Sequence, residues 1–367
     1  MKKYLFMAVA ALATLTACQP GDEPQTIVET REISFAPIAN ETRATAVDET
    51  KTATLQNGFA VWGYVKETAG SGNFVEIFNN TIVKYVDVTN VTTSDFGNVT
   101  KVWQPEGGDI KYWAPNSTYW FSALYPQDAA NYAFSTTGNT HTQEITGFEI
   151  TGDGVGTKDI VVAQPASAVL AATHTRPAVG LTFDHMLARV RFAFRNGFAD
   201  NNVTIEISNV ELNGLIAKAD ATISSVGKAT WTKIGDGTTK LDFQDNNDVF
   251  TIENKSIGAT TETDTVATQY RLFIPTSVEK DAYKLSFDLV VKADGVTVLT
   301  KRYTVDNNRG TNDDPAVGLK AVNYENGKSY LFSATINGDL LKEDIYPIQF
   351  DVNVTDWASD KYMGDIF

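Results

Sequence analysis

The stretch that decides the fold is "KLSFDLVVKADGVTVLTKRYTV", residues 284 to 305. Apolar side chains occupy every second position from Leu285 to Val291, and serine, aspartate and lysine fall on the opposite face of an extended chain. The dipeptide Asp294-Gly295 is typical of a two-residue hairpin turn. The chain then returns through β-branched residues, so the stretch predicts an antiparallel β-hairpin.

Alternation with period two recurs along the chain, and no window carries the i, i+3, i+4, i+7 stripe of an amphipathic helix. In "VTIEISNVEL", residues 203 to 212, the alternation slips by one residue near Ser208-Asn209, which predicts a β-bulge. Many short strands lie between clusters of glycine, asparagine and aspartate. They predict an all-β protein built from antiparallel β-sandwiches.

The N-terminus reads as an export signal. Two lysines precede an apolar run, Tyr4 to Ala17, that is too short to span a bilayer, so residues 1–17 are predicted to be a signal peptide. Cys18 follows directly and is the only cysteine, which excludes an intrachain disulfide. "LTAC" resembles the bacterial lipobox, which implies cleavage before Cys18 and its acylation, palmitate included. The alternative is a cysteine that merely ends an apolar segment.

The length and the net charge of the chain indicate how many domains it forms and which kinds of partner it binds. The chain of 367 residues suggests two domains of ordinary size. Their boundary is predicted near residue 184, which gives an N-terminal domain over 44–184 and a C-terminal domain over 185–367. A formal net charge of −15 argues against nucleic acid and against electrostatic docking on anionic lipid. Contact with a membrane is therefore expected only through the lipid anchor.

Motifs for chemistry are missing from the sequence. The three histidines, His141, His174 and His185, do not form an H-E-x-x-H motif, and no G-x-S-x-G elbow occurs. The glycine-rich stretch 152–159 leads into a strand pattern, so it offers no helix N-terminus to a phosphate. We expect no enzyme, no cofactor and no metal site.

Two oxygen-rich stretches could supply ligands to calcium. They lie around Asp245 and Asp248 and at residues 312–316. Neither has the spaced acidic signature of a calcium-binding loop, so solvated turns are the preferred interpretation. The sequence does not decide whether any loop binds calcium.

The densest aromatic stretch is "YWAPNSTYWFSALYP", residues 112 to 126. Its alternation covers both faces with large side chains, which favours a thick β-sheet core. The alternative is a platform for sugar stacking that uses Trp113 and Trp120. That alternative would make the protein a monomeric, glycan-binding surface lipoprotein.

Four stretches together resemble one family. "YWAPNSTYWFSALYP", "KDIVVA" at 158–163, "LTFDHMLARVRF" at 181–192 and "VNVTDW" at 352–357 are similar, in this order, to the fimbrillin family of Bacteroidota, whose members build type V pili. The likeness extends from the lipobox to the C-terminus. His185 matches the family's F-x-H-x-L pattern and is interpreted as a structural residue at a domain start.

The resemblance implies two tandem transthyretin-like antiparallel β-sandwich domains and an outer-membrane lipoprotein precursor. It further implies that an Arg-specific surface protease removes the first strand, and that a strand from another fimbrial subunit fills the vacated groove. The mature protein would then be a structural subunit at the cell surface, in the stalk or tip of a fimbria, that supports cell adhesion. The sequence does not name host or bacterial surface ligands.

The predicted removable strand belongs to residues 18–43, a propeptide that also contains the lipid tether. Ile33 and Phe35 share one face of an extended chain, and Pro37 limits hydrogen bonding on the far side, as expected of an edge strand. If buried, each apolar side chain would contribute about 1.5 to 3 kcal/mol.

Two arginines flank this strand. Cleavage at Arg31 would trim only the tether, whereas cleavage at Arg43 would release the strand. Arg43 is followed by Ala44 in a polar stretch suited to proteolysis, so we predict the cut between these two residues. The alternative is an ordinary exposed arginine in a linker.

The C-terminal strand is the predicted donor. Its alternating apolar residues are Ile348, Phe350, Val352 and Val354. The same pattern also suits a strand that stays within its own domain, so the identity of the donated strand and the position in the fibre remain open.

Overall fold

The computed structural model describes fifteen segments of the chain: residues 33–39, 58–67, 73–87, 101–108, 110–137, 140–169, 179–200, 202–224, 228–244, 249–253, 265–276, 283–306, 318–319, 323–341 and 348–356. Cys18, Arg43 and Ala44 lie outside the described residues. The oxygen-rich stretches 245–248 and 312–316 also lie outside them.

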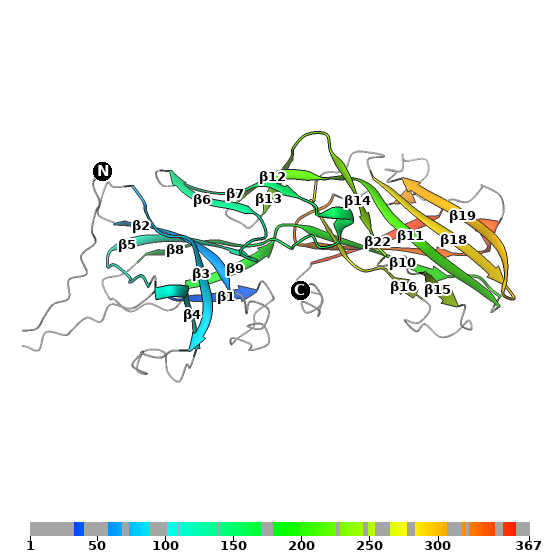
Figure 1. Ribbon diagram of the computed structural model, residues 1–367, viewed down its shortest axis with the longest axis horizontal. Helices are drawn as coiled ribbons and strands as arrows, with labels where there is room; N and C mark the ends of the chain where they lie inside the picture. Colours follow the sequence, from blue (N-terminus) through cyan, green and yellow to red (C-terminus); the bar gives the residue numbers. More distant parts are fainter. Residues whose placement is uncertain are drawn as a thin grey trace, which may run out of the picture.

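The described chain consists almost entirely of β-strands, with short 3-10 turns between some of them (Figure 1). The all-β class predicted from the alternation is therefore confirmed. Large β-branched and aromatic side chains at every second position favour extended backbone, because they pack on a pleated surface.

Seven strands of the N-terminal half close into a barrel with the order β1-β4-β3-β2-β5-β8-β9. The strands are β1 (Phe35–Ala39), β2 (Phe59–Glu67), β3 (Val75–Asp87), β4 (Lys101–Pro105), β5 (Ser117–Tyr125), β8 (Val161–Val169) and β9 (Val179–His185). The barrel lies at one end of the elongated molecule (Figure 1).

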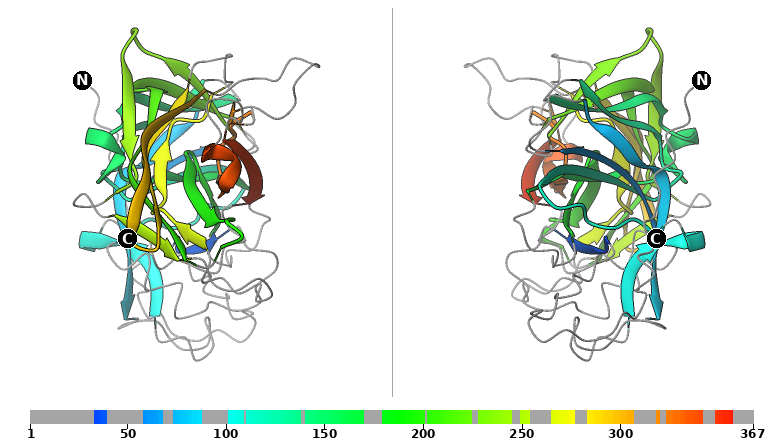
Figure 2. Two further views of the ribbon diagram at one scale, coloured as in Figure 1. Left: turned by 90° about the vertical axis from the view of Figure 1, so that its right-hand side faces the viewer. Right: turned by 90° about the vertical axis from the view of Figure 1, so that its left-hand side faces the viewer.

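Two sheets form the opposite end. The first has the order β16-β10-β21-β22-β20, with β17 also paired to β10; its strands are β10 (Ala188–Asn196), β16 (Thr265–Ala267), β17 (Arg271–Phe273), β20 (Gly318–Leu319), β21 (Lys328–Ile336) and β22 (Gln349–Asp356). The second has the order β14-β11-β18-β19, with β15 also paired to β11; its strands are β11 (Val203–Ile216), β14 (Thr238–Asp242), β15 (Phe250–Glu253), β18 (Lys284–Ala293) and β19 (Val296–Asp306). Figure 2 views the molecule from this end and from the barrel end.

A four-stranded sheet joins the two ends. Its order is β13-β12-β7-β6, with β6 (Asn131–Thr137), β7 (Thr140–Glu149), β12 (Lys218–Ile223) and β13 (Ala229–Lys233). The β12–β13 hairpin thus pairs with a strand that precedes the predicted domain boundary near residue 184. That boundary and the layout of two tandem transthyretin-like sandwiches stay predictions.

The decisive hairpin is confirmed in detail. β18 and β19 pair antiparallel, and Asp294 and Gly295 form the turn with φ of 50° and 77°. All four alternating apolar residues from Leu285 to Val291 are fully buried. The predicted bulge is also confirmed, since the register of β11 against β18 shifts between Ser208 and Glu211.

The core consists of two clusters of buried side chains. One fills the barrel. The other begins on the barrel's outer face, with Trp62 and Leu124, continues under the four-stranded sheet through Phe148, and extends between the two C-terminal sheets to Phe192 and Phe287. The two ends of the molecule therefore share one continuous apolar layer.

The link between β9 and β10 is held by several contacts. His185 Nδ1 lies 2.5 Å from Asp159 Oδ2, which joins the "KDIVVA" stretch to the "LTFDHMLARVRF" stretch. The Trp231 indole N–H of β13 donates to the Met186 carbonyl at 3.0 Å. Because Asp159 is buried, this pair supports the interpretation of His185 as a structural residue.

Candidate functional site

β1 occupies a special position in the barrel wall. It pairs parallel with β9 over five residues, from Phe35 opposite Val179 to Ala39 opposite Phe183. On its other side it pairs antiparallel with β4 at a single position, Phe35 opposite Trp103. The predicted edge strand therefore has a neighbouring strand on both sides, but its ladder with β4 consists of a single residue pair.

The side chains of this segment belong to the barrel core. Ile33 is 1% exposed and Phe35 is 2% exposed. At about 1.5 to 3 kcal/mol for each buried apolar side chain, the pair contributes several kcal/mol. The backbone adds two hydrogen bonds beyond the ladders: Val179 N–H donates to Ser34 O at 2.8 Å, and Ile33 N–H donates to Lys111 O at 2.8 Å.

Phe35 sits in a pocket of phenylalanine rings. Its ring centroid lies 5.7 Å from that of Phe121, 5.8 Å from Phe78 and 6.4 Å from Phe59, all in edge-to-face arrangements. Such pairs stabilise beyond the area they bury. A Cβ on Gly63 would lie 2.9 Å from the Phe78 ring, so glycine is needed there for the ring to reach its place. Without β1, these rings would line an open apolar slot.

The aromatic stretch at 112–126 forms core, as predicted. Trp113 is 2% exposed and packs against Tyr119, with ring centroids 4.7 Å apart. The Tyr119 hydroxyl accepts a hydrogen bond from Ala114 N–H, and burial raises the pKa of Tyr119. A sugar platform on Trp113 is therefore ruled out by burial.

Trp120, the second residue of the sugar-platform alternative, is half-buried. Its ring lies 4.6 Å from the imidazole of His141. Burial lowers the pKa of His141, which keeps the ring neutral near neutral pH. The ring faces of Trp120 are thus partly occupied by the protein's own side chains.

The predicted donor residues divide into two pairs. Ile348 and Phe350 are buried, at 4% and 1% exposure, whereas Val352 is half-buried and Val354 is 43% exposed. β22 pairs with β21 over six residues on one side and with β20 over two residues on the other. Beyond Phe350, the second edge of β22 pairs with no strand among those that the structure describes.

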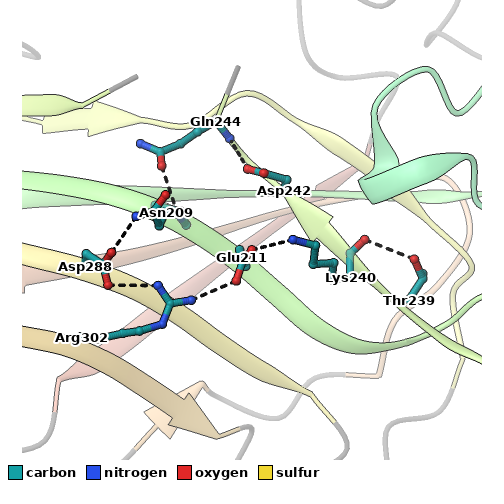
Figure 3. A network of polar contacts seen from close by, with 9 residues as sticks. Asn209, Glu211, Thr239, Lys240, Asp242, Gln244, Asp288 and Arg302 are labelled. Atoms are coloured by element: carbon teal, nitrogen blue, oxygen red, sulfur yellow. Dashed lines mark hydrogen bonds and ion pairs between the residues drawn. The ribbon is translucent and has the colours of Figure 1, made fainter. Parts of the chain in front are cut away.

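The outer face of β11, β14, β18 and β19 carries a network of ion pairs (Figure 3). Arg302 contacts Asp288 at 3.0 Å and Glu211 at 2.9 Å, and Glu211 also accepts from Lys240 at 2.7 Å. The hydrogen bond to Glu211 raises the pKa of Lys240. Since donors and acceptors satisfy one another here, we interpret the network as a solvated structural surface.

Two further searches concern only the described residues. Their His, Cys, Asp and Glu side chains form no group of three or more that could hold a metal ion. None of their helices is long and apolar enough to span a bilayer. The slot around β1 is therefore the strongest candidate site in this part of the chain.

Comparison with protein families gives one match, to a model described as fimbrillin-like, over residues 42–357. The chain belongs to the fimbrillin-like family. The resemblance found in the sequence is thus confirmed, and the family is one of fimbrial proteins rather than of enzymes. Fimbrillin-like proteins act at the cell surface and associate with other fimbrial subunits.

One solved structure supports this fold. A fimbrial protein from Bacteroides vulgatus ATCC 8482 matches with a TM-score of 0.59 and 15% identity, covering 89% of this chain and 99% of that chain. A fimbrial assembly protein from Parabacteroides distasonis ATCC 8503 matches with a TM-score of 0.40 and 12% identity, covering 89% and 99%. No curated protein matches the chain.

The sequence predicted the segment that fills the slot, but it did not predict most of the residues that line the slot. Phe59, Phe78 and Trp103 come from three separate strands, and the β9 ladder adds Val179. Alternation alone places each of them on an apolar face. It does not show which strands become neighbours.

Proposed function

We propose that this fimbrillin-like protein is a structural subunit of a type V-like fimbria, in its stalk or tip, that supports cell adhesion. It is exported as a lipoprotein acylated at Cys18, cut by an Arg-specific protease between Arg43 and Ala44, and assembled by β-strand exchange. One observation carries the proposal. β1 and the two residues before it supply two core side chains, Ile33 and Phe35, yet a single residue pair joins β1 to β4.

The connection between β1 and the barrel decides how strongly β1 is held. While the chain is intact, β1 rebinds its own slot as an intramolecular event at a high effective concentration. A cut at Arg43 falls between Ala39, the last residue of β1, and Phe59, the first residue of β2. The freed segment then rebinds only as a separate peptide, so dilution favours its loss.

The two arginines that flank β1 differ in what their cleavage would release. Cleavage at Arg31 would leave β1 joined to the barrel and its slot filled. Arg43 is therefore the arginine that fits the proposal.

Departure of β1 would create a site for strand addition. The edge of β9 would lose its partner along five residues, and the pocket of Phe59, Phe78 and Phe121 would open. An unpaired strand edge beside empty apolar pockets binds an extended segment with alternating side chains. β22 is the candidate donor, through Ile348, Phe350, Val352 and Val354.

The proposal is tested by electron microscopy of the purified chain after treatment with an Arg-specific protease. Fibres are expected from the parent chain and from Arg31→Ala, because both can lose β1. No fibres are expected from Arg43→Ala. Fibres from Arg43→Ala, or a parent chain that stays monomeric after complete cleavage, would contradict the proposal.

A further inference from the structure

A cavity on the outer face of the barrel lies away from the β1 slot. Its volume is about 270 Å³, and its walls come from β2, β3, β5, β6 and β7 and from the loop between β5 and β6. The closed strand order places β2 and β5 three strands from β1 in either direction. The cavity is therefore on the wall opposite the slot, and β1 supplies none of its described lining residues.

Two aromatic rings form the apolar part of the cavity wall. Trp62 of β2 and Tyr132 of β6 both line the cavity, with ring centroids 4.8 Å apart in an edge-to-face arrangement. The Tyr132 hydroxyl lies 2.5 Å from Ser122 Oγ, which fixes the orientation of its ring. Trp62 is only 6% exposed and belongs to the core. The cavity therefore offers a rigid aromatic surface to a ligand.

Three primary amides form the polar part of the wall. They belong to Asn80, Gln127 and Asn131, which are all exposed. Within the described part of the chain, these three side chains take part in no hydrogen bond and no ion pair. Each amide carries two N–H donors and a carbonyl acceptor, so all three can bind a ligand without breaking a contact inside the protein.

A β-bulge places one of these amides beside the aromatic rings. The register of β2 against β3 shifts between Val61 and Gly63, so that Asn79 and Asn80 together stand opposite Trp62. Asn80 has a φ of 49°, a left-handed conformation that few residues other than glycine, asparagine and aspartate adopt. Bulges of this kind redirect side chains, and they are frequent next to functional sites. Here the bulge accompanies an Asn80 side chain that lines the cavity.

The lining residues also indicate the charge of the ligand. Among the described residues, no lysine, arginine, histidine, aspartate or glutamate lines the cavity. Burial raises the pKa of Tyr132, so its hydroxyl is neutral as well. A charged ligand would lose its hydration here without gaining a counter-ion, and the formal net charge of −15 further disfavours anions.

From this arrangement we infer that the cavity binds one ring of a neutral sugar. Sugar hydroxyls both donate and accept hydrogen bonds, which matches the amides of Asn80, Gln127 and Asn131. The C–H groups of a pyranose ring are apolar and pack against Trp62 and Tyr132. A volume of about 270 Å³ lies just below the range of pockets for drug-sized ligands, so it suits a single ring.

This inference goes beyond the proposed function and does not depend on strand exchange. The site uses neither Trp113 nor Trp120. A fibre of such subunits would carry one cavity in each copy, so weak binding at a single cavity would add up to firm attachment on a surface rich in glycans.

Saturation-transfer difference NMR on the uncleaved, full-length chain tests the inference. The probes are the methyl glycosides of glucose, galactose, mannose, fucose, N-acetylglucosamine and N-acetylgalactosamine, together with glucuronate and galacturonate as charged counterparts. We expect transfer to at least one neutral glycoside, with a Kd in the millimolar range that is usual for so small a ligand. Transfer to the two uronates should be weaker than to glucose and galactose.

Two variants locate the binding site. Asn80→Gly removes the amide and keeps the left-handed backbone, and Gln127→Ala removes a second amide from an exposed loop. Each should weaken binding about two- to tenfold, the usual effect of losing one hydrogen bond. Asn116→Gly is the matched control, because Asn116 is also exposed, has a φ of 53° and does not line the cavity. Its Kd should equal that of the parent chain.

Three results would overturn the inference. The first is no transfer to any neutral glycoside, and the second is stronger transfer to the uronates. The third is an equal Kd in the parent chain, Asn80→Gly and Gln127→Ala, which would place the bound sugar elsewhere. Because the assay uses the uncleaved chain, these results are independent of whether the protein forms fibres.

Discussion

Replacing Phe35 with alanine tests how firmly β1 is held in the barrel. Phe35 is 2% exposed and touches three phenylalanine rings, so the change removes an aromatic side chain from a packed pocket. Buried Phe→Ala changes typically cost about 3 to 5 kcal/mol. Since the lost contacts belong to β1, we expect the free energy of opening β1 to fall by about this amount.

Amide hydrogen exchange at Val179 reports that opening directly, because its N–H donates to Ser34 O of the β1 segment at 2.8 Å. At about 1.4 kcal/mol for each factor of ten, Phe35→Ala should accelerate exchange at Val179 at least roughly a hundredfold in the uncleaved chain. Tyr112→Ala is the control, since Tyr112 is 52% exposed and should change exchange by only about twofold. An acceleration below about fivefold in Phe35→Ala would refute the view that Phe35 holds β1 in place.

Three further predictions concern the rest of the fold. Asp159→Ala should lower the free energy of unfolding by about 1 to 3 kcal/mol in urea denaturation, because it removes the buried carboxylate that contacts His185. The control, Asp128→Ala, breaks an exposed ion pair and should cost less than about 1 kcal/mol. Equal losses in the two variants would contradict a structural role for the contact between Asp159 and His185. Gly63→Ala should destabilise the barrel by about 1 to 3 kcal/mol, because its Cβ would lie 2.9 Å from the Phe78 ring; an unchanged urea midpoint would show that the ring can move. Burial raises the pKa of Tyr132, so its hydroxyl stays protonated in the folded state; its contribution to stability is full below about pH 10, the unfolded value, and is lost as pH rises further. Tyrosinate absorbance of Tyr132→Phe should match that of the parent until alkaline unfolding begins, and an earlier difference would refute the burial argument.

The sequence predicted individual strands well, because alternation is a local property. The hairpin with Asp294 and Gly295 and the bulge near Ser208 both depend on residues close together in the chain. The burial of Ile33 and Phe35 followed from the same reasoning. In each case neighbouring side chains decide which face of the strand is apolar.

Pairings between distant segments could not be predicted in this way. β12 pairs antiparallel with β7 and so joins the two halves, and side chains of both strands belong to the same buried cluster as Trp62 and Leu124 on the outer face of the barrel. The sequence pattern shows that both faces of a strand are apolar, but it does not show which other strands pack against those faces. The contact between Asp159 and His185 could not be predicted for the same reason, since 26 residues separate the two side chains in the sequence.

The most direct test of the strand-exchange mechanism is the structure of the assembled fibre, determined by cryo-electron microscopy at a resolution that shows side chains. We expect the strand between β9 and β4 to come from a neighbouring subunit, with residues 33–39 absent from the barrel. Density for Ile33 and Phe35 of the same chain in that position would contradict it.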